Sequence, residues 1–151
     1  MKSRINELKE LKNQIEDSET LMNLIAAILS NYKEDSINSD MCLIHSVFFE
    51  MQHELKLDEL INLNFDRIVY RFSRDLYDAL YKLEKSVLSI HTINNDSFYI
   101  LNDIKSLKEY YMSKFTIEEQ SEITIGSELL NSKILIYKPI KEKYVSRAST
   151  K

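Results

Sequence analysis

The sequence predicts a mainly α-helical fold with one small β-hairpin and a long N-terminal helix. Only one Gly and one Pro occur in 151 residues. Both residue types interrupt helices, so their scarcity favours long helical segments joined by short turns. Apolar residues recur at helical spacing over most of the chain. Residues 86–93 instead alternate in polarity and are rich in β-branched side chains, and residues 97–101 form a short apolar run of strand length.

The composition excludes several classes of protein. Hydrophobic residues make up 44% of the chain and charged residues 29%, with a net charge of −4, values typical of a chain that buries one core. Cys42 is the single cysteine, which excludes an internal disulfide and a cysteine-based zinc site. No stretch approaches the ~20 apolar residues of a membrane span. We therefore expect a cytoplasmic protein that has no membrane partner and no cofactor.

The N-terminal segment comprises residues 1–34. Within it, residues 3–33 are expected to form one long helix. Its apolar residues follow a heptad pattern, with Ser18 at one d position and a capping sequence at residues 17–20 that could break the helix. One interpretation is an ordinary packing helix. The other is a seam for self-association or for a protein partner, formed by Leu8, Leu11, Ile15, Met22, Ile25 and Leu29.

Residues 40–115 are expected to form the core. After the polar linker 35–40, residues 41–55 form an amphipathic helix that Ser39 or Asp40 can cap, and Asp58 can begin a short helix. Residues 66–86 also show helical spacing, and Ser73 offers a second helix start within them.

The segment 87–101 predicts the hairpin. Asn94, Asn95 and Asp96 tolerate the left-handed backbone of a tight turn, and each flanking run has the length of a strand. The alternative is continuous helix with Asp96 or Ser97 as the next cap. A further helix, 103–115, is expected to follow.

Residues 116–140 begin with Thr116-Ile117-Glu118-Glu119, which matches a capping box. The runs 122–125 and 133–137 are compatible either with two short strands around Gly126 or with a terminal helix. Residues 141–151 are polar and basic, and we expect a flexible tail there.

The order helix 41–55, short helix, helix 73–86, hairpin and closing helix resembles a winged helix-turn-helix, and the stretch LYDALYKLEKSVLSIHTINNDSFYIL carries the resemblance. Val87 departs from it, because a Gly is common there, and FDRIVYRF at 65–72 is longer than the usual turn. More narrowly, FSRDLYDALYKLEKSVLSI resembles the middle components of ABC-three-component systems. That resemblance implies an accessory subunit paired with an ATPase of the structural-maintenance-of-chromosomes type in bacterial defence.

Basic residues offer a second functional interpretation. Arg67, Arg71 and Arg74 would share one face of an unbroken helix and, with Lys82 and Lys85, could bind DNA phosphates. The competing interpretation is a salt-bridged face, since acids lie four residues from Arg71, Arg74 and Lys82. Residues 73–86 carry equal numbers of acidic and basic side chains, so the gain from counterion release would be small.

No catalytic or metal-binding pattern is present in the sequence. The three histidines, His45, His53 and His91, lack the spacing of a metal helix, and no nucleophile motif occurs. We therefore expect a non-catalytic protein-binding accessory subunit of a multiprotein bacterial assembly, with an anti-phage role and a large ATPase as partner. The alternatives are a dimeric winged-helix DNA-binding regulator and a phage- or plasmid-encoded inhibitor or immunity protein with a helical-bundle fold.

Overall fold

The computed structural model describes residues 4–67 and 71–149. This part of the chain is mainly helical, with two small antiparallel sheets, which confirms the predicted fold class. The elements in chain order are α1 (Arg4–Ser30), β1 (Ser36–Asn38), α2 (Met41–Glu54), α3 (Asp58–Ile61), β2 (Asp66–Arg67), β3 (Arg71–Phe72), α4 (Arg74–Glu84), β4 (Ser89–Ile93), β5 (Asp96–Ile100), α5 (Asn102–Ser106), α6 (Lys108–Met112) and α7 (Ile117–Ser149).

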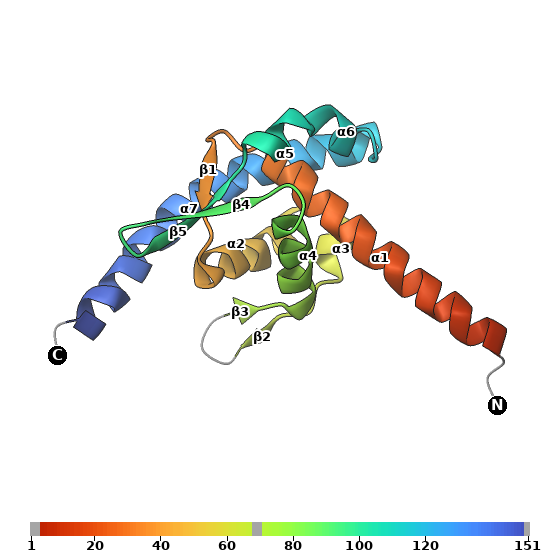
Figure 1. Cartoon of the computed structure of the whole chain (residues 1–151), viewed down its shortest axis with the longest axis horizontal. Coiled ribbons are helices and arrows are strands. Elements are labelled where there is room, and N and C mark those ends of the chain that lie inside the picture. Colours follow the sequence, from red (N-terminus) through yellow and green to blue (C-terminus); the bar gives the residue numbers. More distant parts are fainter. Residues whose placement is uncertain (1–3, 68–70, 150–151) are drawn as a thin grey trace.

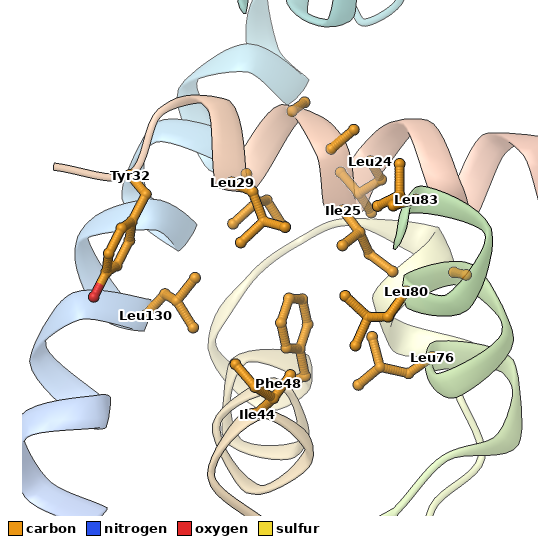
Figure 2. Packing of buried hydrophobic residues seen from close by; sticks show 14 of the residues in the cluster. Leu24, Ile25, Leu29, Tyr32, Ile44, Phe48, Leu76, Leu80, Leu83 and Leu130 are labelled. Atoms are coloured by element: carbon orange, nitrogen blue, oxygen red, sulfur yellow. The ribbon is translucent and has the colours of Figure 1, made fainter. Parts of the chain in front are cut away.

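The core lies where the second half of α1 meets α2, α4 and α7 (Figure 2). Phe48 of α2 is fully buried at the centre of this contact. Leu76, Leu80 and Leu83 of α4 lie toward Leu24 and Ile25 of α1, while Leu130 contributes from α7. The helix α1 runs unbroken through residues 17–20, because its apolar second half is held on several sides by tertiary packing.

The predicted caps of α2 and α4 are both present. Asp40 Oδ1 accepts a hydrogen bond from the backbone N–H of Leu43 at 3.2 Å, and Ser73 Oγ accepts one from Leu76 at 3.3 Å. These side chains satisfy N–H groups that have no partner within the helix. Asp58 does not cap α3, because it is the first residue of that helix and Leu57 occupies the cap position.

The predicted hairpin is confirmed. Strands β4 and β5 pair antiparallel, with Ile93 opposite Asp96, and φ is 51° at Asn94 and 69° at Asn95. Two consecutive positive φ values in a two-residue loop define the turn whose twist matches that of the strands. The third strand, β1, lies in the expected linker and pairs with β5, giving the order β1-β5-β4.

Residues 66–86 do not form one helix. Asp66 pairs with Phe72 and Arg67 with Arg71, so β2 and β3 form a small second sheet before α4 begins. The expectation of one helical face carrying Arg67, Arg71 and Arg74 is therefore wrong, because these residues belong to β2, β3 and α4. The intervening residues 68–70 lie outside the described part of the chain.

The closing helix expected at 103–115 is divided into α5 and α6. The break is at Leu107, where φ is −102° and ψ is 16°. Ile104, Tyr111 and Phe115 are nevertheless buried as the spacing predicted, whereas Leu107 is exposed.

The C-terminal segment is one helix, α7, which settles the alternative between two short strands and a terminal helix. Thr116 and Glu119 form the predicted capping box: Thr116 Oγ1 accepts from the Glu119 N–H at 3.2 Å, and Glu119 Oε1 accepts from the Thr116 N–H at 3.0 Å. The helix continues to Ser149, so the backbone of residues 141–149 is helical where we expected a flexible tail. Lys133 joins α7 to α2 through ion pairs with Glu50 at 2.7 Å and Glu54 at 2.9 Å.

Candidate protein-interaction surface

The heptad face of α1 is divided between two environments. Figure 1 shows the first half of α1 extending away from the other elements toward the N-terminus. Leu8 and Leu11 on this half are 59% and 54% exposed, whereas Ile25 and Leu29 on the second half are 0% and 1% exposed. Met22, at the boundary, is half-buried against the core, and the side chain of Ile15 lies outside the described set.

The predicted seam therefore does not act as one surface. The second half of the seam is buried in the core of this chain, so Ile25 and Leu29 are not available to another molecule. Its first half is open. We call its exposed residues Leu8 and Leu11, together with the neighbouring exposed residue Ile5, the α1 stripe.

A groove begins where the α1 stripe reaches the body of the molecule. It has a volume of about 830 Å³ and lies between α1, α3 and α4. Gln14 and Ser18 of α1 line it, three and seven residues after Leu11. Residues at that spacing lie on one side of a helix, so the stripe and the groove form a continuous surface.

Most of the charged side chains that line this groove are acidic. Asp58 and Glu59 come from the first turn of α3, and Asp75 and Asp78 come from α4. The single cationic side chain among the lining residues is Lys82. We call these four carboxylates and Lys82 the acidic groove.

Several groove carboxylates have no cationic partner. Asp78 pairs with Arg74 at 3.3 Å, but Asp58, Glu59 and Asp75 have no ion pair within the described residues. The Oε2 atom of Glu59 is buried and, in the part of the chain that the structure describes, has no hydrogen-bond donor. Placing an unpaired carboxylate oxygen away from water is costly, and a cationic neighbour removes that cost.

Lys82 is tied to α1 by a hydrogen bond. Its Nζ donates a hydrogen bond to Ser18 Oγ at 2.6 Å, which ties α4 to α1. Sequence reasoning missed the acidic groove because its carboxylates lie in two helices that only the fold brings together. The available signal was the pair of acidic first turns, which also suits the helix dipole and so does not identify a site.

Arg67, Arg71 and Arg74 belong to three different elements and do not form one helical face. Arg71 is half-buried with its guanidinium 4.1 Å from the ring centroid of Phe49. Arg74 pairs with Asp78, and the Nζ of Lys85 lies 4.4 Å from the ring centroid of Tyr81. The side chain of Arg67 lies outside the described set. Arg74 and Lys85 nevertheless share one face of α4, where Arg74 lies over Tyr77, Lys85 lies over Tyr81, and the two tyrosine rings stack.

The histidines are not gathered into a site. His45 is fully buried, stacks on Phe72 with ring centroids 4.8 Å apart, and accepts a hydrogen bond at Nδ1 from Ser73. Burial lowers its pKa to about 4. Over the described residues, no group of three or more His, Cys, Asp or Glu side chains is arranged to hold a metal ion.

No described helix is long and apolar enough to cross a membrane. Comparison with known proteins gives no relative from which a role could be transferred: no family model, no curated protein and no solved structure matches this chain.

Proposed function

We propose that this chain is a non-catalytic accessory subunit that binds a protein partner through the first half of α1. The observation that carries the proposal is the exposure of Leu8 and Leu11 on a heptad face whose later members form the core. The first half of α1 extends from the body and carries apolar residues on one face. Such a face favours a helical partner, because the partner removes the apolar side chains from water.

The α1 stripe does not stabilise the chain itself. Each of its residues is more than half exposed, so little of their apolar area leaves water when the chain folds. The charged residues around the stripe, such as Lys12 and Glu16, form exposed ion pairs of small energetic value. A surface that contributes little to folding and presents leucines at heptad spacing suits association with another chain.

The wider assembly is proposed from the resemblance. The order α2, α3, α4, β4 and β5 supports a winged-helix core, to which β2 and β3 are an addition between α3 and α4. The helix α4 carries the spaced leucines Leu76, Leu80 and Leu83 ahead of the hairpin. The stretch 72–90 supports a middle component of an ABC-three-component system. In that role the partner is a large ATPase subunit of a bacterial anti-phage complex.

The test is co-expression of the tagged chain with the products of its adjacent genes, followed by calorimetry on any complex that purifies. We expect an adjacent product to bind the wild-type chain and the double variant Leu8→Gln/Leu11→Gln to bind at least tenfold more weakly. Glutamine keeps the helix propensity of leucine close to unchanged, so the variant removes apolar surface without disrupting α1.

The matched control is Asn6→Gln/Asn13→Gln, two exposed positions on the side of the same helix segment that faces away from Leu8 and Leu11. It should bind as the wild type does. Equal affinities for the wild-type chain and the stripe variant, or failure of every adjacent product to bind, would contradict the proposal.

The DNA-binding regulator is the alternative. The ion pair of Arg74 with Asp78 and the equal numbers of acidic and basic residues in 73–86 argue against it. Binding to random duplex DNA at about 50 mM salt decides between the two. Strong binding that is lost in Arg74→Glu/Lys85→Glu would assign the regulator function. The helical-bundle inhibitor has no observation of its own in favour of it.

A further inference from the structure

We infer that the partner segment is a basic amphipathic helix that packs along the α1 stripe and places cationic side chains in the acidic groove. This inference rests on the protein-binding role proposed above and adds the chemistry of the partner. Its three supports are the continuity of stripe and groove, the charge of the groove and the charge of the adjoining flank of α1.

Continuity sets the path and the length of the partner helix. The stripe begins at Ile5, and the groove extends to Leu21 of α1. At 1.5 Å per residue this distance is about 24 Å, so a partner helix of about 16 residues covers it. One helix therefore meets apolar side chains at the free end of α1 and carboxylates where α1 joins the body.

The negative charge of the groove favours a partner segment with positive charge. Four carboxylates against Lys82 leave a net charge of −3. Lys82 is directed to Ser18, and Asp58, Glu59 and Asp75 have no ion pair within the described residues. A partner ammonium or guanidinium group entering this hollow gains from several carboxylates at once, whereas an acidic group is repelled.

The flank of α1 beside the groove has the same sign. Glu7 precedes Gln14 by seven residues, so it lies on the groove side of the heptad face and extends the acidic surface toward the stripe. In paired helices such flanking positions set the choice of partner through charge. A second copy placed parallel would bring one acidic groove near another, which favours a different, basic chain over self-association.

The experiment uses two synthetic peptides of 18 residues with identical leucines at the a and d positions. One carries Lys at the e and g positions, and the other carries Glu. Binding of each labelled peptide to the full chain is measured by fluorescence anisotropy. We expect the Lys peptide to bind with a micromolar dissociation constant and the Glu peptide to bind at least tenfold more weakly.

Variants locate the binding. Asp58→Asn/Asp75→Asn should lower the affinity for the Lys peptide at least tenfold. Leu8→Gln/Leu11→Gln should lower this affinity as well. The matched control is Glu118→Gln/Glu128→Gln, which removes the same charge from exposed positions of α7, one of them also in a first helical turn. It should change the affinity less than twofold. Circular dichroism verifies that each variant is folded.

Three outcomes would overturn the inference. Equal binding of both peptides would show that charge does not select the partner. Equal weakening by the groove variant and the α7 control would indicate binding to overall negative charge. A wild-type dimer by light scattering that is lost in Leu8→Gln/Leu11→Gln would assign the stripe to a second copy.

Failure of this inference is distinguishable from failure of the proposed function. If an adjacent gene product binds in a Leu8- and Leu11-dependent manner while the Lys peptide does not bind, the protein-binding role stands and the basic chemistry is wrong. If the Lys peptide binds at the groove but no adjacent product does, the surface chemistry stands and the accessory role is wrong.

Discussion

His45 in α2 accepts a hydrogen bond at Nδ1 from the backbone N–H of Ser73, at 3.0 Å. Ser73 is the residue whose hydroxyl caps α4, so one buried imidazole holds the start of the helix that lines the acidic groove. Because Nδ1 is the acceptor, the neutral ring carries its proton on Nε2, and a second proton would remove this contact.

This contact predicts a loss of stability in acid. Burial lowers the pKa of His45 from 6.5 to about 4, so between these pH values the unfolded chain binds a proton that the folded chain does not. Stability therefore falls as the pH drops from 6.5 to about 4, by up to about 3 kcal/mol at about 1.4 kcal/mol per pKa unit. Urea unfolding at several pH values in this range measures the effect. His45→Gln should flatten the dependence, and His53→Gln, at an exposed position, should preserve it.

The two halves of the α1 heptad face are predicted to respond differently to truncation. Leu29→Ala should lower the free energy of unfolding by about 2–5 kcal/mol, because it opens a cavity in the core. Leu11→Ala should change it by less than about 0.5 kcal/mol, because its side chain is exposed. Chemical denaturation of both variants checks the contrast, and similar losses would mean that the first half of α1 packs on the body.

The turn of the hairpin predicts opposite effects for two kinds of substitution. Asn94→Ala/Asn95→Ala places residues without a compensating polar side chain at φ values of 51° and 69°, which costs about 1–2 kcal/mol per residue. Asn95→Gly should instead maintain or raise stability, since glycine adopts these angles without strain. Thermal unfolding distinguishes the two, and a drop in melting temperature for Asn95→Gly would contradict the turn geometry.

The capping box at the start of α7 predicts a loss of stability when its hydroxyl is removed. Thr116→Ala removes the hydroxyl that accepts from the Glu119 N–H and should lower the free energy of unfolding by about 1 kcal/mol. Thr124→Ala is the matched control within the same helix. Its hydroxyl bonds to the Gln120 carbonyl, a group that the helix already satisfies, so its removal should be nearly neutral.

Gly126 of α7 packs closely against α2, so a larger residue at this position is predicted to lower stability. A Cβ atom there would lie 2.9 Å from Leu55 Cδ1 and 3.3 Å from Met51 Cε. Gly126→Val should therefore lower the free energy of unfolding by about 1–3 kcal/mol through overpacking. Gly126→Ala should cost less, because better helix propensity offsets part of the contact. Denaturant unfolding of both variants tests this order.

Short-range chemistry determined much of this fold from the sequence alone. The Asp40 and Ser73 caps, the capping box at Thr116 and the Asn94-Asn95 turn each depend on residues within a few positions of one another, and all are present. Helical spacing also identified most of the buried face of α2 and that of α4, because a side chain's direction follows from its position along the helix. Met41, at the start of the predicted face of α2, is exposed.

Only the tertiary structure decided which parts of an apolar helix face remain exposed. The heptad pattern of α1 is the same at Leu11 and Leu29, yet one is exposed and the other lies in the core, because α2, α4 and α7 reach only the second half. Strand β1 forms because β5 is beside it, and the acidic groove exists because α3 and α4 bring distant carboxylates together. Such contacts join residues far apart in the chain, so no local pattern encodes them.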